Sequence, residues 1–217
     1  MKVYEPNQLE NILPFLDFEP GWLLLGGPGD AGEAQMMRRL YPDAAIIGFE
    51  PNPHLYNLQL ARGFPGRLVP VALWQDQKKI SINVPDMNHE WWHRQRLGSA
   101  VAFVEPPCRE SYEVDADTLD HLDQLYGPFE DAVLWIDIEE SELYALRGSQ
   151  RLLRTGKIRL INAEVHDRYV NSIGALLGPS GIREVRRWNA NTSINEEGLR
   201  HDWWNIIYKL DDRGPAP

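Results

Sequence analysis

The sequence has a single cysteine, Cys108, among its 217 residues. One cysteine excludes an internal disulfide and a metal cluster held by several thiolates. This usage fits a reducing compartment, where disulfides are rare. We predict no metal site.

Long apolar stretches are also missing. No run approaches the roughly 20 residues that a helix needs to cross a bilayer. The N-terminus does not show the basic start and apolar core that mark a signal peptide. We therefore expect a cytoplasmic protein that does not bind a membrane.

Positive charge is scarce. The chain has 22 Lys and Arg residues against 32 Asp and Glu residues, a net charge of −10. This balance opposes general binding to DNA or RNA phosphates, so we expect no nucleic-acid partner. Arg183, Arg186 and Arg187 are too sparse to form a nucleic-acid groove, and suit a solvated face or a small anionic substrate.

Internal repeats, low-complexity segments and linkers are not found either. A chain of 217 residues, 43% of them apolar, suits one α/β domain with a sizeable core. We therefore expect a single domain over residues 1–217, with an N-terminal lead-in at residues 1–20. Whether the chain forms a homo-oligomer is left open.

The most informative segment that is present runs from Trp22 to Glu50. An apolar strand leads into a glycine loop, a helix and a second apolar strand that ends at Glu50. Gly27, Gly29 and Gly32 match the pattern G-x-G-x-x-G, which permits a tight turn and a close approach of a ligand to the backbone. Because a carboxylate can accept both hydroxyl protons of a ribose, the segment predicts a nucleoside-binding half-domain.

The alternation of strands and helices continues and is then interrupted. Arg67–Leu73 is predicted as the third strand, and residues 76–117 as an insertion. Long insertions often cover a binding face, so we expect this one to act as a lid. Within it, Trp91 and Trp92 suit stacking on a sugar face, or else packing of the loop itself.

The C-terminal half contains four further predicted strands. Asp131–Asp137 and Ile158–Ala163 are strongly apolar, as buried parallel strands are. Arg183–Trp188 and Trp203–Leu210 follow, joined by the polar segment Asn189–Asp202, in which no helix is plausible. We therefore expect the last two strands to form an antiparallel pair at one edge of an otherwise parallel sheet.

The residues that follow the strands carry the candidate chemistry, because open α/β sheets bind ligands beyond the carboxyl ends of their strands. Four of the five strand ends carry an acidic or histidine side chain. The five are Gly27–Gly32, Glu50-Pro51-Asn52, Ala72-Leu73-Trp74, Asp137-Ile138-Glu139 and Glu164-Val165-His166.

Five short motifs resemble those of FkbM-type methyltransferases and occur in the same order. They are GFEPNP at 48–53, TLD at 118–120, IDIEESE at 136–142, LRGSQRLL at 146–153 and AEVH at 163–166. The resemblance implies the class I methyltransferase fold, a Rossmann-like sheet of about seven mostly parallel strands with an antiparallel last strand and helices on both faces. It also implies S-adenosylmethionine as cofactor and methyl transfer to a hydroxyl of a sugar or other small molecule.

The candidate site residues divide by role. Cofactor-binding candidates are Gly27, Gly29, Asp30, Gly32, Glu50, Pro51, Asn52, Ala72, Leu73 and Asp137. Catalytic candidates are Asp137, Glu139 and His166, and substrate candidates are Trp91, Trp92 and Glu164. Two roles have structural alternatives, because Asp137 could cap the following helix and His166 could bond a backbone group.

Three positions depart from the family pattern. Leu25 stands where an acid is common, Trp135 where a lysine is usual, and Glu140 where the family has glycine. The acid normally contacts the amino end of the cofactor, and Asp30 or backbone carbonyl groups are candidates to replace it. These departures keep open a non-catalytic binding or scaffold protein on the same fold. A second alternative is an NAD-dependent oxidoreductase, whose ribose needs the same acceptor as Glu50.

Overall fold

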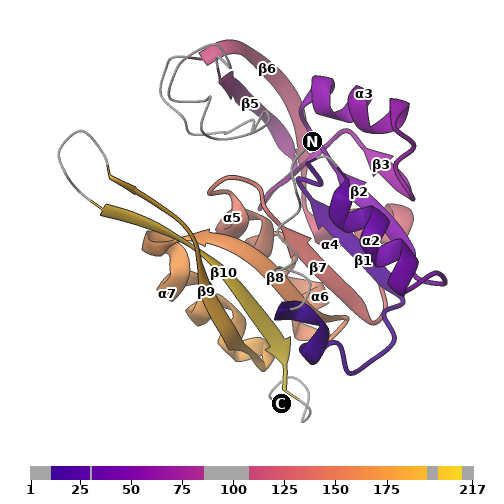
Figure 1. Cartoon of the computed structure of the whole chain (residues 1–217), viewed down its shortest axis with the longest axis vertical. Coiled ribbons are helices and arrows are strands. Elements are labelled where there is room, and N and C mark those ends of the chain that lie inside the picture. Colours follow the sequence, from indigo (N-terminus) through magenta and orange to yellow (C-terminus); the bar gives the residue numbers. More distant parts are fainter. Residues whose placement is uncertain (1–10, 30, 86–107, 195–199, 212–217) are drawn as a thin grey trace.

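The computed structural model describes residues 11–29, 31–85, 108–194 and 200–211 (Figure 1). Its main element is a seven-stranded sheet with the strand order β3-β2-β1-β7-β8-β10-β9. The strands are β1 (Trp22–Gly26), β2 (Ala45–Phe49), β3 (Arg67–Val69), β7 (Ala132–Ile136), β8 (Ile158–His166), β9 (Ile182–Ile194) and β10 (Arg200–Leu210).

Five neighbouring strands of this sheet run parallel, from β3 through β8. Strand β10 is antiparallel to both β8 and β9, so the predicted antiparallel ending is confirmed. The β9–β10 ladder is longer than predicted and continues to the pair Ile194 and Arg200. The polar segment Asn189–Asp202 was wrongly predicted as a mere connection, because an antiparallel ladder depends on backbone pairing and tolerates polar side chains on exposed faces.

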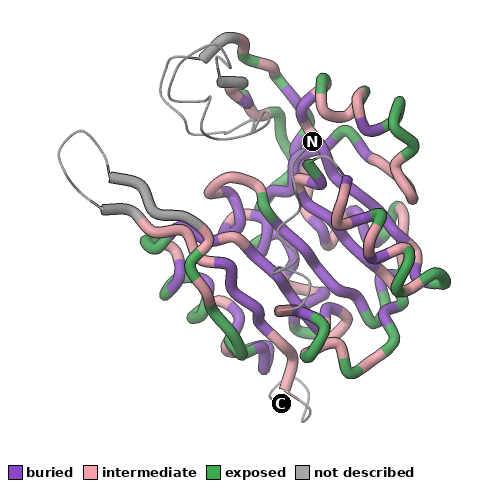
Figure 2. The backbone as a smooth tube through the Cα atoms, in the orientation of Figure 1, coloured by how far each residue is buried: buried purple, intermediate pink, exposed green. Residues whose placement is uncertain are grey.

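Helices cover both faces of the sheet, as predicted. Side chains of a strand alternate between faces, so Leu24 and Leu134 enter one apolar cluster while Leu23 and Val133 enter the other. The first cluster is closed by α4 (Leu119–Tyr126), α5 (Glu142–Arg147), α6 (Gln150–Arg154) and α7 (Asp167–Leu177). The second is closed by α2 (Gly32–Leu40) and the short 3₁₀ helix η1 (Leu13–Phe15). Figure 2 shows the buried central strands between these outer layers.

The predicted third strand, Arg67–Leu73, is wrong as a single element. Proline has no backbone N–H to continue a ladder, and the strand breaks at Pro70 into β3 and β4 (Ala72–Leu73). Strand β4 belongs to a second sheet of order β4-β6-β5, with β5 at Lys78–Pro85 and β6 at Cys108–Asp117. Residues 86–107, which include Trp91 and Trp92, lie outside the described residues.

The second sheet lies beside helix α3 (Pro53–Ala61), which follows Glu50 directly. The ring Nε2 of His54 on α3 lies 2.7 Å from the Tyr112 hydroxyl on β6. The insertion therefore packs next to the segment that leaves the end of β2, and its role as a lid stays a prediction. No helix within the described ranges is long and apolar enough to span a membrane.

Candidate cofactor and acceptor site

The glycine loop after β1 is held against two neighbouring strands. Gly27 has φ +67°, and its N–H donates to the carbonyl oxygen of Phe49 at 3.1 Å. A Cβ atom at Gly27 would lie only 2.2 Å from the Asp137 carbonyl oxygen, so only glycine allows this contact between the loop and the end of β7.

Among the described residues of the loop, Gly29 is the exposed one, whereas Pro28 and Ala31 are buried. Gly29 is exposed at φ +50°, and its carbonyl accepts from Nε2 of the buried Gln59 at 2.6 Å. Ala31 is left-handed and precedes α2, which begins at Gly32 without a side-chain cap. Asp30 lies outside the described residues. Close approach of a ligand is open at Gly29, and the role of the loop in cofactor binding stays a prediction.

Glu50 lies at the end of β2 and is only 4% exposed. Its Oε1 accepts from the Asn52 N–H at 2.9 Å, and within the described residues no group bonds its other oxygen. Burial raises the pKa of Glu50 to about 7, although the bond from Asn52 opposes the rise. A buried carboxylate with one uncommitted oxygen beside a glycine loop is what a ribose diol requires.

Asn52 and Leu73 have structural contacts at this end of the sheet. Asn52 is 1% exposed and caps α3, accepting from the His54 N–H at 2.9 Å. Leu73 packs over Gly26, where its Cδ1 lies 2.9 Å from the place a Cβ would occupy. Ala72 is buried with Trp74 in the core of the second sheet.

The loop after β7 brings several acids together. The N–H of Asp137 donates to the Gly26 carbonyl at 3.2 Å, which ties this loop to the end of β1. The side chain of Asp137 reaches solvent, yet the surrounding protein desolvates it. Its pKa lies well above the usual value, first through that desolvation and then through the charges of Glu164, Glu139, Glu142 and Glu33. We call Asp137, Glu139, Glu142 and Glu164 the carboxylate cluster.

Glu142 is a site residue whose role the sequence did not reveal. It is 1% exposed and begins α5, and its Oε1 accepts from the Ile138 N–H at 3.0 Å. Burial raises its pKa to about 8. The available signal for Glu142 in the sequence was its place in the IDIEESE motif. Asp137 makes no capping bond within the described part of the chain.

Glu164 and His166 lie within β8 instead of after it, because the strand extends to residue 166. The predicted strand end at Ala163 was therefore wrong. His166 is 5% exposed and caps α7, with its Nδ1 3.3 Å from the Arg168 N–H and its ring against Trp203. The structure thus gives His166 a bond to the backbone, and its catalytic role stays a prediction.

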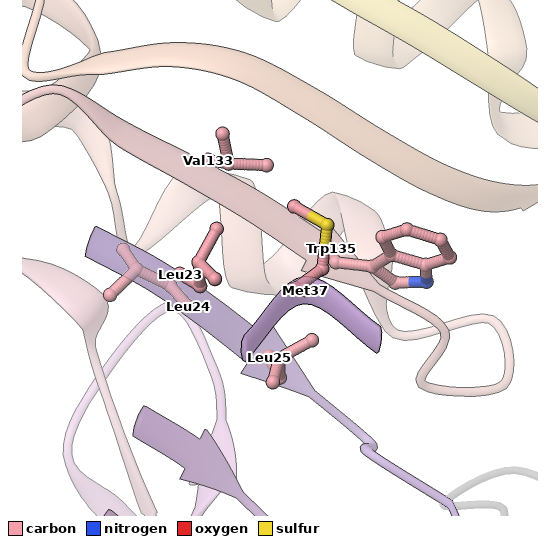
Figure 3. Close-up of a pocket in the computed structure, with 6 residues that line it drawn as sticks. All are labelled: Leu23, Leu24, Leu25, Met37, Val133 and Trp135. Carbon is pink, nitrogen blue, oxygen red and sulfur yellow. The ribbon is translucent and has the colours of Figure 1, made fainter. Parts of the chain in front are cut away.

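Two of the departures from the family pattern lie side by side. Leu25 and Trp135 are partners across β1 and β7, and both are buried. Together with Met37 of α2 they line a small apolar cavity in the core (Figure 3). Position 25 therefore faces the core and cannot contact a cofactor ammonium group.

The third departure, Glu140, leads to a stability prediction. Glu140 has φ +70°, a left-handed conformation that glycine adopts freely, and its side chain pairs with Arg168. A left-handed non-glycine residue costs about 1–2 kcal/mol, so Glu140→Gly should stabilise the protein by up to about 1 kcal/mol after the entropy of glycine is subtracted. Thermal unfolding should show a Tm about 2–4 °C higher. Arg168→Gln, which removes the ion pair together with the contact of the guanidinium with the Tyr169 ring, is the control. An unchanged or lower Tm for Glu140→Gly would contradict the prediction.

Three features define a class I methyltransferase fold. Antiparallel β10 is inserted between β8 and β9, a glycine loop follows β1, and a buried acid follows β2. A doubly wound dinucleotide-binding sheet has no such inserted antiparallel strand, which counts against the oxidoreductase alternative. The model of the methyltransferase FkbM domain matches residues 30–191. The chain therefore belongs to the FkbM methyltransferase family.

Comparison with solved structures finds related folds at low identity. A proposed sarcosine dimethylglycine methyltransferase of Galdieria sulphuraria is 12% identical, with 94% of this chain and 83% of that chain covered and a TM-score of 0.47. The YcgJ protein of Bacillus subtilis is 9% identical, with coverages of 94% and 98% and a TM-score of 0.46. The precorrin-6y C5,15-methyltransferase of Geobacter metallireducens is 11% identical, with 93% of this chain and 87% of that chain covered and a TM-score of 0.44. No curated protein matches the sequence.

Proposed function

We propose that the protein transfers a methyl group from S-adenosylmethionine to a hydroxyl of a small acceptor molecule, such as a sugar. The observation that carries this proposal is the Glu50 carboxylate, which is buried beside the glycine loop and keeps one oxygen free of any bond within the described residues. Family membership supports methyl transfer in general. The hydroxyl acceptor is our extension of it.

The residues present fit the cofactor. Glu50 would accept both ribose hydroxyl protons, and the exposed backbone of Gly29 would lie along the ligand. Because Leu25 is buried in the core, the ammonium of the methionine portion needs another anionic partner. Asp137, tied to Gly26 and in contact with Gly27, is the nearest acid after β7 that can serve.

When bound, S-adenosylmethionine supplies a methyl group on a positively charged sulfur, which keeps the electron pair of the carbon–sulfur bond that breaks. The protein has to hold the acceptor oxygen in line with that bond, and positioning of this kind provides much of the rate. The hydroxyl proton must pass to a base as the new carbon–oxygen bond forms. Glu139 is the candidate for this role, because it lies in the same loop after β7 and its side chain is half-exposed, where an acceptor can approach.

A non-catalytic binding protein is the second candidate. Leu25 and Trp135 favour this candidate. Both positions usually carry charged residues in the family, and here both side chains are buried in the apolar core. Such a protein would bind the cofactor, or its demethylated product, without transferring the methyl group.

Calorimetry and a transfer assay separate these possibilities. We expect S-adenosylmethionine and S-adenosylhomocysteine to bind below about 1 mM, the upper end of ordinary KM values. Radiolabelled methyl groups should then pass to a hydroxyl compound in a panel of sugars and small alcohols. Binding without transfer to any acceptor favours the binding protein. Failure of both ligands to bind, with stabilisation by NAD instead, would refute the methyltransferase proposal.

A further inference from the structure

The glycine loop is tied at two points to the segment that carries Glu50. At the start of the loop, the Gly27 N–H donates to the carbonyl oxygen of Phe49, the residue before Glu50. Further along, the Gly29 carbonyl accepts from Nε2 of Gln59, a residue of α3, at 2.6 Å. The second tie is a side-chain contact across 30 positions of sequence, so a substitution can remove it without changing the loop itself.

Gln59 is a polar residue in a buried place. Its side chain is 1% exposed, whereas Leu60, the next residue of the same helix, is 51% exposed. The orientation of the amide is fixed by chemistry, because the Gly29 carbonyl oxygen can only accept a hydrogen bond and must therefore face Nε2. The other amide atom, Oε1, is then buried and has no hydrogen-bond partner within the described residues.

This arrangement does little for the stability of the fold. A buried oxygen without a partner costs more free energy than one neutral hydrogen bond returns. Gly29 is exposed, so water can reach this residue when the amide is absent. A methionine of nearly the same shape would avoid the cost of the buried oxygen. The glutamine is therefore better explained by what its bond does to the loop than by its contribution to folding.

We propose that Gln59 is a positioning residue, which holds the Gly29 backbone and the Glu50 carboxylate at the separation that one bound nucleoside requires. The proposal rests on the function proposed above, in which the loop and Glu50 contact the same cofactor. The Asn52 N–H bonds Oε1 of Glu50, and Asn52 caps α3, so the helix that holds Gly29 is joined to the acid through its own first turn. Without this hold, the ligand has to order the loop itself, which lowers its affinity.

The first test needs no ligand. Gln59→Met removes the N–H donor and keeps the length of the side chain. Hydrogen exchange of the full-length protein is measured by mass spectrometry on peptides that contain Gly27 and Ala31, whose N–H groups are both bonded to carbonyl oxygens. Exchange there should be about tenfold faster than in the native protein, as loss of one hydrogen bond allows, with β7 and β8 unchanged. Asn57→Met removes an exposed amide from the same helix and should exchange like the native protein.

The second test is calorimetry with S-adenosylhomocysteine. Gln59→Met should bind this ligand about tenfold more weakly than the native protein at pH 8, without a lower Tm, and Asn57→Met should bind it normally.

Gln59→Glu adds a dependence on pH that a purely structural role would not produce. A carboxyl group can donate to the Gly29 carbonyl only when it is protonated, and burial raises the pKa of such a group. The affinity of this variant, divided by that of the native protein at the same pH, should therefore recover as the pH falls from 8 to 6. The ratio sets aside the titration of Glu50, which both proteins share.

Three results would overturn the proposal. They are unchanged exchange of the loop in Gln59→Met, unchanged affinity of this variant for S-adenosylhomocysteine, and a Gln59→Glu affinity ratio that does not vary with pH. If Gln59→Met does not fold, Gln59→Glu at pH 6 and pH 8 serves for both measurements. If the native protein does not bind S-adenosylhomocysteine, the methyltransferase proposal is the part that fails. Faster exchange in Gln59→Met would then still support the hold on the loop, and unchanged exchange would refute it.

Discussion

Replacing Glu50 by glutamine is expected to weaken the binding of S-adenosylhomocysteine by about ten- to a hundredfold, the loss that follows when a hydrogen bond to a charged group is removed. The amide oxygen of glutamine can still accept from the Asn52 N–H, so the local fold should persist. The substitution removes the second carboxylate oxygen of Glu50, which would accept a hydrogen bond from a ribose hydroxyl. The measurement is calorimetry at pH 8.

The same substitution should stabilise the ligand-free protein at pH 8. The pKa of Glu50 is about 7 in the folded protein against an ordinary value of 4.5, so folding opposes its ionisation. The resulting cost grows as the pH rises from about 4.5 to 7 and is then constant at about 3 kcal/mol. Denaturation at pH 8 should therefore show a more stable Glu50→Gln protein, with the difference nearly gone at pH 4.5.

Ligand binding should follow the opposite trend with pH. Because the ionised carboxylate is the better acceptor, S-adenosylhomocysteine should bind the native protein about tenfold more weakly at pH 6 than at pH 8, a dependence that Glu50→Gln removes. Asp43→Asn, at an exposed acid before β2, is the matched control and should change neither property. Unchanged affinity in Glu50→Gln would refute the ribose-binding role.

Gly27→Ala is expected to be the most destabilising single change in the glycine loop. The new Cβ would lie 2.2 Å from the Asp137 carbonyl oxygen, a backbone atom that no rotamer change can move, and the residue would also be left-handed at φ +67°. Overpacking and left-handed strain together predict a loss of about 3 kcal/mol. Denaturant unfolding measures this loss, and cofactor binding should disappear with it.

Two other glycines with positive φ provide matched controls. Gly63 has φ +74° with nothing within 4 Å of the added atom, so Gly63→Ala should cost only about 1 kcal/mol. Gly29 has φ +50° and its nearest atom is 4.0 Å away, so Gly29→Ala should destabilise equally little. It should nevertheless weaken cofactor binding, because its methyl group enters the exposed loop. If Gly27→Ala loses no more unfolding free energy than Gly63→Ala, the predicted clash between the new Cβ and the Asp137 carbonyl oxygen is refuted.

Much of the fold could be predicted because its signals are local. The continuous apolar run Ala132–Ile136 indicated a buried parallel strand, and the structure buries all five residues. Asn52 followed by Pro53 is a local signal for a helix start, and α3 begins there with Asn52 as its cap. Such patterns act within a few residues and do not depend on what the rest of the chain does.

Pairing between distant segments could not be predicted in the same way. Ala72 and Leu73 pair with Ala116 and Asp117, more than forty positions away, and nothing near them in the sequence indicates this partner. Pro70 is the one local signal in this region, because proline cannot donate to a ladder, and it accounts for the break between β3 and β4. In the β9–β10 ladder, polar residues obscured a backbone pairing that does not need apolar side chains.

The candidate site shows the same division. Glu50 and Gly27 lie in a compact motif, and the sequence placed both beside the expected loop. The burial of Glu142 and the bond from Gln59 to Gly29 arise only when α5 and α3 pack against the sheet, so the sequence alone did not reveal them. The shared cavity of Leu25 and Trp135 likewise depends on their register across two strands.

The close contact of Gly27 with the Asp137 carbonyl makes the glycine loop and the start of the carboxylate cluster one mechanical unit. In the proposed function the cofactor would lie against the loop and Asp137 would face its ammonium group, so both sides of this contact would meet bound ligand. A shift of the loop by one ligand must therefore move the groups that receive the other. Thermodynamic reciprocity then requires that whatever one ligand does to the affinity of the second, the second does equally to the first.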